Sequence, residues 1–536
     1  MKKKKYEIDP GVFYPGAGIL IAIIIWGFLR TDQFTAVMNF LFTWTTDSTG
    51  WFMMIISALI VILCFVICLT PVGDKKVGGP DAQIKHSMFT WIAMITCAGT
   101  ATAAVFYAVA EPITYFHNPP AWWTGYEPET MDTAVRSLSQ AAFHWSFIYY
   151  AMYAFWGFIA GYMIYNHKLP ARPSSALYPL IKDKCFGPIG KAFDVISILG
   201  LVGGMVTSLG LGVTQFAAGL NYVFGITPSN FMYAVTLIVV IASFTLSSIR
   251  GVKKGMAIIS DINAWIYLFV IVFLVIAGPT LFEAKIFTQV TGEIFTRFLP
   301  NALAADSFNV GGGWVQNNTI FYLAWIMAYA PLMGVFGGRI ATGYTWRRYL
   351  LVGVLGPGIF NIVWFTVFGS NAIYLDAFKN AGIYNEIVDK GVQVGNYALL
   401  KYLPFQGIMI PLVVAALFFG FITLADAMTG TLAKSTIKAD THSDAEAPMS
   451  MKVVWGAIVG FDTFLCLFTL GTNGMTALQC MSVFFGLPMF IASLLVIIQL
   501  PKMCSLKMDK EMEKMTPEQL ENLSLGKPAG KVDGKT

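Results

Sequence analysis

Aromatic residues follow one another in two apolar stretches of this chain, and their rings could hold a cation without an ion pair. The first stretch, 321–333, contains Phe321, Trp325, Tyr329 and Met333 and carries no charge. Aromatic faces attract quaternary ammonium groups through the ring quadrupole. The stretch therefore suggests a cage for a methylated amine. The alternative, that these rings only fill helix contacts, stays open at this point.

A second aromatic stretch, 144–153, repeats this composition and contains Trp145, Tyr150 and Tyr153. A phenol hydroxyl adds a hydrogen bond to a carboxylate or hydroxyl on a ligand. Two such stretches in one chain favour a shared aromatic cage over isolated packing positions. We interpret His144, at the start of this stretch, as a packing residue rather than a proton carrier.

Small and hydroxyl-bearing residues interrupt a third apolar stretch. The run consists of Gly99, Thr100, Ala101, Thr102 and Ala103. Such a run lets a membrane helix unwind, so that freed backbone groups can bind a substrate, although it also permits ordinary close packing of helices. A similar run occupies residues 203–212. We expect the first run to be an unwound segment near the binding site.

Carboxylates inside apolar stretches are costly and are usually functional or paired. The chain has four of them, Glu111, Asp261, Asp426 and Asp462. Asp426 lies three residues after Thr423, so the two could form an ion site. Asp426 could equally relay protons or accept hydrogen bonds from unwound backbone.

Composition identifies a membrane protein. The chain has 536 residues, of which 56% are hydrophobic and 12% charged, whereas soluble proteins carry about 25% charged residues. The seven cysteines show no metal-binding spacing, and we expect no metal, no cofactor and no nucleic-acid partner. The sequence has no nucleophile–base pair that would indicate an enzyme. It also has no ring of charges and no carbonyl filter motif that would indicate a channel.

Twelve apolar segments are long enough to cross a bilayer, which takes about 20 residues. They lie near 12–30, 50–70, 88–117, 134–165, 188–222, 228–249, 255–278, 315–341, 347–371, 404–433, 453–471 and 477–500. We expect one transporter domain, 12–500, between an N-terminal arm, 1–11, and a C-terminal tail, 501–536. Residues 280–304 alternate in polarity and predict an amphipathic helix along the outer interface.

The distribution of basic residues predicts the orientation. With twelve spans, one side of the membrane holds both termini and 28 of the 35 lysines and arginines, and Lys452 is counted among its loops. Basic loops stay in the cytoplasm. We therefore expect a multi-pass protein of the cell (inner) membrane with both termini cytoplasmic and the lipid bilayer around it.

At several landmarks the sequence resembles the betaine/choline/carnitine transporter family, over essentially all twelve spans. The landmarks are Glu111-Pro112, Phe143-His144-Trp145, Pro173-Ser174-Ser175, Ser208 to Gly212, Ile320-Phe321-Tyr322 with Trp325, and Gly338-Arg339-Ile340. The resemblance implies an all-α membrane fold in which two inverted five-helix repeats, spans 3–7 and 8–12, follow two extra helices. It also implies alternating access and a homotrimer.

The resemblance further implies which residues bind the substrate, and we call this set the aromatic box. It comprises Trp145, Tyr150, Tyr153, Phe321, Trp325, Tyr329 and Met333. The family often has tryptophan where this chain has Leu323, Ile326, Tyr150 and Tyr329, so the box is richer in phenol. The run from Gly99 to Ala103 is more similar to that of the carnitine exchangers, as is Met333.

Coupling is the least determined property. Sodium-driven members of the family carry a Thr-Ser pair where this chain has Thr423-Leu424. The leucine removes one oxygen ligand for a hard cation. The sodium-independent exchangers place an arginine in span seven, where this chain has Asn263. Asp426 could compensate as an ion or proton ligand.

These observations predict a secondary transporter of small quaternary ammonium compounds. In order of preference the substrates are carnitine or γ-butyrobetaine, glycine betaine or a related betaine, and choline. We favour sodium-independent exchange of a betaine for its metabolic product. The alternatives are a sodium- or proton-coupled symporter and an amino acid carrier of the same broad fold.

Overall fold

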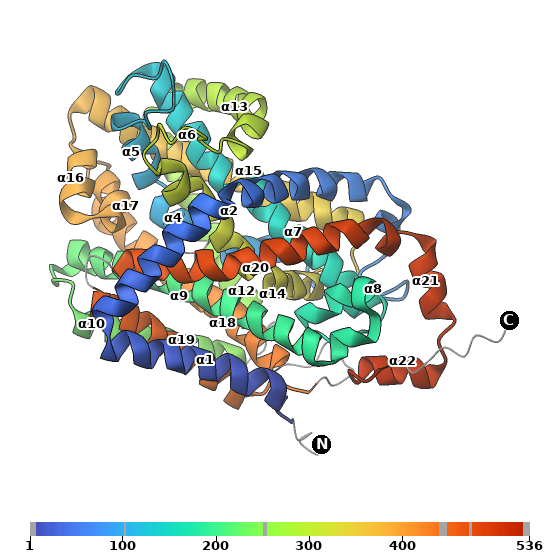
Figure 1. The fold of residues 1–536 in the computed structure, drawn as a ribbon. Helices are drawn as coiled ribbons and strands as arrows, with labels where there is room; N and C mark the ends of the chain where they lie inside the picture. The colour runs from blue at the N-terminus through green and yellow to red at the C-terminus, as the bar shows by residue number, and fades with distance from the viewer. Residues whose placement is uncertain (1–6, 101–102, 250–254, 439–446, 471–473, 529–536) are drawn as a thin grey trace.

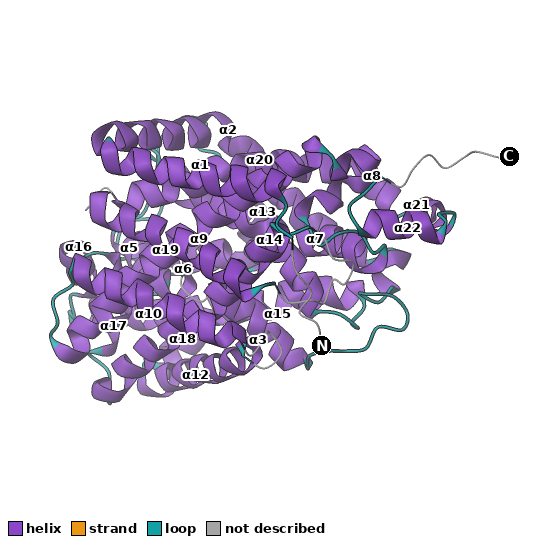
Figure 2. Ribbon diagram, turned by 90° about the horizontal axis from the view of Figure 1, so that it is seen from below, coloured by secondary structure: helices purple, strands orange, loops and turns teal. Residues whose placement is uncertain are grey.

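The computed structural model describes residues 7–100, 103–249, 255–438, 447–470 and 474–528, and in these ranges it contains helices and no strand. The helices cross one another in several layers (Figures 1 and 2). In Figure 1, α22 lies at the lower right and the first turn of α1 at the bottom centre, whereas α13 and α16 lie at the upper left.

Eleven helices in the described ranges are long and apolar enough to span a membrane, and a sharply bent pair makes a twelfth. This confirms the expected twelve spans. The unbroken ones are α1 (Pro10–Leu29), α2 (Thr31–Cys68), α9 (Pro188–Phe224), α10 (Asn230–Ile249), α12 (Met256–Ala277), α14 (Phe321–Ile340, preceded by the π-helical η5, Gln316–Ile320), α15 (Trp346–Lys379), α18 (Gln406–Ser435), α19 (Met449–Leu470) and α20 (Gly474–Met503).

The third span is broken, as its small residues predict. It consists of α3 (Met88–Thr100), α4 (Ala103–Tyr107) and α5 (Ala110–His117), and its two halves meet at 69°. Gly99 lies at the end of α3. Ala101 and Thr102, and the side chains of Thr100 and Ala103, lie outside the described residues.

The fourth span has a break that the sequence does not announce. It consists of α6 (Met131–Trp145), α7 (Phe147–Gly161) and the π-helical η2 (Tyr162–Asn166), with Ser146 between α6 and α7 in a non-helical conformation. Helix ends leave carbonyl groups without partners. The amide of Asn361 on α15 donates to the Trp145 carbonyl at 2.6 Å, which stabilises the break and fixes the backbone of Trp145.

The contacts between spans have the symmetry that an inverted repeat predicts. Spans 4, 5 and 6 of the first repeat contact their counterparts in the second, as α7 packs on α15, α9 on α18 and α10 on α19. The contact of α9 with α20 has its counterpart in the contact of α18 with α12. The two five-helix repeats therefore interlock, and α1 and α2 precede them.

Glycines let α7 and α14 cross closely. A methyl group at Gly334 would lie 2.5 Å from the backbone nitrogen of Gly157, and one at Gly338 would lie 3.2 Å from the Cα of Gly161. Small residues at helix crossings bring backbones together in membranes. This crossing places the two aromatic stretches of the sequence side by side.

The remaining elements cover the two ends of the bundle. They are η1 (Pro71–Asp74), η3 (Pro173–Leu177), α8 (Tyr178–Ile181), η4 (Lys182–Phe186), α13 (Thr280–Ala302), α16 (Ile383–Lys390), η6 (Val392–Val394), α17 (Gly395–Leu400), α21 (Leu506–Glu513) and α22 (Pro517–Ser524). The amphipathic segment predicted at 280–304 is the helix α13. It buries Ile286, Val290 and Ile294 and packs against α6 and α15.

Candidate functional site

Three buried rings from α6 and α14, those of Trp145, Phe321 and Trp325, form a cluster that we call the outer cluster. The centroids of Trp145 and Trp325 lie 6.0 Å apart with perpendicular planes, and Phe321 stacks on Trp325 at 5.4 Å. All three side chains are at most 1% exposed. The structure thus brings together residues that are 180 positions apart in the sequence.

Tyrosines from α7 and α14 form an inner cluster next to the outer one. The rings of Tyr153 and Tyr329 lie 6.3 Å apart, and Tyr149 lies 5.1 Å from Tyr153 and 5.0 Å from Tyr150. The hydroxyls of Tyr149 and Tyr153 are 3.1 Å apart. These phenols give the cluster a polar side that the indoles alone would not supply.

Carbonyl groups of small residues orient the rings. The Trp325 indole N–H and the Tyr329 hydroxyl both donate to the carbonyl of Gly204 on α9, each at 3.1 Å, and Tyr149 donates to the carbonyl of Gly99. A methyl group at Gly204 would lie 2.7 Å from the Tyr329 ring. The run 203–212 therefore holds two box residues in place, and Gly99 of the first run holds Tyr149, a neighbour of the box.

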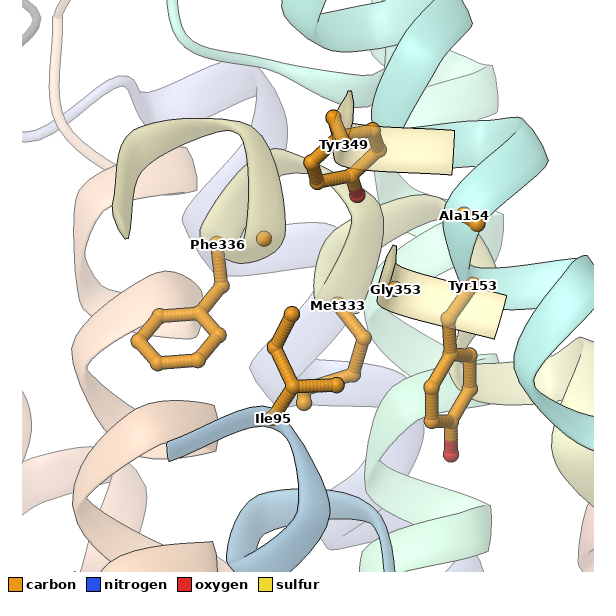
Figure 3. A pocket seen from close by; sticks show the side chains of 8 residues that line it. Ile95, Tyr153, Ala154, Met333, Phe336, Tyr349 and Gly353 are labelled. Atoms are coloured by element: carbon orange, nitrogen blue, oxygen red, sulfur yellow. The ribbon is translucent and has the colours of Figure 1, made fainter. Parts of the chain in front are cut away.

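The aromatic box extends further along α14 than the length of one small ligand. Phe321 and Met333 are twelve residues apart on α14, which is about 18 Å along a helix. Met333 instead lines a cavity of about 20 Å³ together with Tyr153, Ile95 and Phe336, shown in Figure 3. A cavity of this size has room for about one water molecule, so a ligand enters this part only if the rings separate.

Sequence reasoning missed several rings around Trp145. Tyr107 on α4 lies nearly parallel to it at 5.6 Å, Phe365 on α15 lies parallel at 6.1 Å, and Tyr322 lies at 4.9 Å. Tyr322 belongs to an aromatic stretch that was recognised, whereas Phe365 stands in an ordinary span with no local signal. The wall around Trp145 therefore comes from three separate spans.

The residues of the possible ion site are already engaged. The Thr423 hydroxyl donates to the Phe419 carbonyl at 3.0 Å. Asp426 accepts a hydrogen bond from Ser247 at 3.1 Å and lies 3.8 Å from the ammonium group of Lys452. Lys452, which was counted with the basic loops, lies in the first turn of α19, and its side chain is 2% exposed.

Comparisons with known proteins agree over nearly the whole chain. A family model described as "BCCT, betaine/carnitine/choline family transporter" matches residues 11–509. A probable glycine betaine transporter of Desulfitobacterium hafniense (strain Y51) is 31% identical over 485 residues, which cover 90% of this chain and 95% of that protein.

Two further relatives differ in their named substrates. The high-affinity choline transport protein of Escherichia coli (strain K12) is 30% identical over 488 residues, or 91% of this chain and 70% of that protein. An ectoine/hydroxyectoine transporter of Virgibacillus pantothenticus is 30% identical over 511 residues, or 95% of this chain and 99% of that protein.

Proposed function

Because this chain belongs to the betaine/carnitine/choline family of transporters, we propose that it exchanges one trimethylammonium betaine for another across the cell membrane. Secondary transport of betaine- or choline-type quaternary ammonium compounds follows from the family and from the relatives' names. The preferred pair is carnitine and γ-butyrobetaine. Glycine betaine and choline are next in order.

The ring arrangement supports a trimethylammonium ligand. Trp325 and Trp145 offer indole surface, and Tyr149, Tyr153 and Tyr329 bring hydroxyls to the same place. Rings attract the ammonium group without a counter-ion, and hydroxyls can donate to a carboxylate or to a substrate hydroxyl. A betaine carries both groups, so it uses both clusters.

The pairing of Asp426 carries the proposal of sodium-independent exchange. Lys452 and Ser247 already satisfy this carboxylate, and Leu424, buried at 2% exposure, occupies the position where a hydroxyl would complete a sodium site. A hard cation needs several oxygen ligands. Exchange needs no ion gradient, because the outgoing substrate resets the carrier.

Uptake into proteoliposomes tests the proposal. Labelled carnitine, glycine betaine and choline are offered outside, with each unlabelled compound or none inside, in sodium or in potassium buffer. We expect uptake only with internal substrate and equal rates in both salts. Accumulation in empty liposomes under a sodium or proton gradient would instead establish symport, and competition by common amino acids or ectoine would change the substrate class.

We extend the proposal to the assembly and orientation of the protein. From the family resemblance we propose a homotrimer, in which a second copy would cover the apolar groove between α2 and α13 that is lined by Val61, Phe65, Phe295 and Leu299. The basic loops support cytoplasmic termini for the domain 12–500. Light scattering of the detergent-solubilised protein measures the copy number, and labelling of single cysteines at the termini with an impermeant reagent reports the side.

A further inference from the structure

A carboxylate lies directly behind the aromatic box. Glu111, in the first turn of α5, has a side chain that is 1% exposed. Its Oε2 accepts a hydrogen bond from the Trp145 indole N–H at 2.8 Å. Its Oε1 lies 2.5 Å from His144 Nδ1 and accepts from the Tyr115 hydroxyl at 3.1 Å.

His144 links Glu111 to two further polar side chains. Its Nε2 lies 2.9 Å from the side-chain amide of Gln140 and 2.9 Å from the Thr319 hydroxyl. These contacts hold the ring beside Glu111.

The other surroundings of Glu111 are uncharged. Within the described ranges, its ion-pairing distances involve His144 alone. Besides Tyr115, the phenols of Tyr107 on α4 and Tyr322 on α14 interact with it electrostatically, and a phenol is neutral at physiological pH. The N-terminal turn of α5 favours an anion at this position. The carboxylate is thus held by His144, Trp145 and Tyr115 and by the helix terminus.

We propose that Glu111 is a positioning and specificity-determining residue, which holds the Trp145 indole and makes the aromatic box favour a positively charged ammonium group over an uncharged group of the same shape. This inference rests on the proposed function. An anion one residue behind the box wall attracts a cation in the box through a medium that screens it weakly. It adds no comparable attraction for a neutral isostere.

The test compares a cation with its carbon analogue. Choline and 3,3-dimethylbutan-1-ol have the same shape, but a carbon atom replaces the charged nitrogen. Affinities for both are measured on purified wild type and on Glu111→Gln, by competition against whichever labelled quaternary ammonium compound the wild type binds. Glu127→Gln, an exposed carboxylate in the same outer region, is the matched control, and Glu111→Asp retains the charge.

In Glu111→Gln we expect affinity for choline to fall about tenfold or more, as loss of a weakly screened unit charge predicts, while affinity for the alcohol changes less than about twofold. Glu111→Asp should recover most of the preference, and Glu127→Gln should match wild type. An equal loss for both ligands would overturn the proposal and leave Glu111 a structural residue. If wild type binds no quaternary ammonium compound, the proposed function itself fails.

Discussion

Trp325 is the ring with the best-defined orientation in the outer cluster. Its indole N–H is bound to the Gly204 carbonyl, Phe321 covers one face, and the edge-on contact with Trp145 fixes its tilt. A ring held in this way loses little freedom when a ligand binds. It is therefore the residue at which a cation–π contribution is easiest to measure.

Replacement of Trp325 by alanine should weaken substrate binding about thirtyfold. A desolvated cation–π contact contributes about 2 kcal/mol, and every 1.4 kcal/mol is about tenfold in affinity. Trp325→Phe keeps a ring and should lose less. Equilibrium binding of labelled betaine to the purified variants measures both values. Trp51→Ala, at an exposed position, is the control, and unchanged affinity in Trp325→Ala would exclude this ring from the cage.

Glu283 predicts a pH dependence of stability. It lies on α13, outside the spans, and burial raises its pKa to about 7, although the Asn371 amide donates to it. The folded state thus holds a proton that the unfolded chain releases near pH 4.5. This stabilising contribution is complete below pH 4.5 and disappears as pH rises through 7.

Glu283→Gln should therefore melt a few degrees above wild type at pH 8.5 and close to wild type at pH 5. The amide replaces the carboxyl with a neutral group of similar shape. Thermal unfolding in detergent at the two pH values measures the difference. A constant offset at both values would show that Glu283 does not titrate between them.

Residue types predicted which rings could form the aromatic box, but not all the residues that surround these rings. Trp145 and Trp325 stand in aromatic runs, and the fold brings them together. Phe365 and Lys452 have no local signal, because their positions depend on packing between spans far apart in the sequence. Whether the predicted set binds a substrate stays a prediction, for which Trp325 is the first test.

At the scale of elements, the crossing of α7 and α14 depends on glycine. Gly334→Ala should lower the melting temperature and the yield of folded protein, because the added methyl group meets the Gly157 backbone. Gly18→Ala is the matched control, since a methyl group there meets nothing within 4 Å. Fluorescence-detected gel filtration after heating compares them, and equal stability of the two variants would contradict the close crossing.

Hydrophobic length was sufficient to predict the twelve spans and the amphipathic α13, since long apolar runs must be buried in lipid or protein. It could not predict the break at Ser146. The carbonyl freed there is satisfied by Asn361, from a span more than 200 residues later. The length of 134–165 allows a tilted or broken span, but local sequence carries no record of such a partner and does not mark Ser146 as the break.

At the scale of the molecule, the C-terminal tail is attached to the end of a site helix. Asp509 on α21 pairs with Lys75 and accepts from the Tyr162 hydroxyl at 2.7 Å. Burial raises the pKa of Asp509, but these hydrogen bonds outweigh burial and hold its pKa below the usual value. The tail therefore joins the loop after α2 to the end of the fourth span.

Asp509→Asn should release this tail. Trypsin is expected to cleave at Lys507, Lys510 and Lys514 several times faster in this variant than in wild type, because the neutral amide no longer holds Lys75. Glu518→Gln, an exposed change on α22, should leave the cleavage rate unaltered. Indistinguishable rates in wild type and Asp509→Asn would mean that other contacts, among them the ion pair of Glu511 with Lys182, dock the tail.

The uncharged rings of the aromatic box also determine what the membrane voltage can do. A unit charge that crosses the membrane gains or loses about 2.3 kcal/mol per 100 mV. Phenols and indoles carry no formal charge, so the rings contribute nothing to this energy when the site opens to one face or the other. The membrane voltage would then do no net work on a zwitterionic betaine, whereas it would draw choline inward because choline carries a positive charge. Under the proposed function, the same site would be electrically silent with a betaine and voltage-driven with choline.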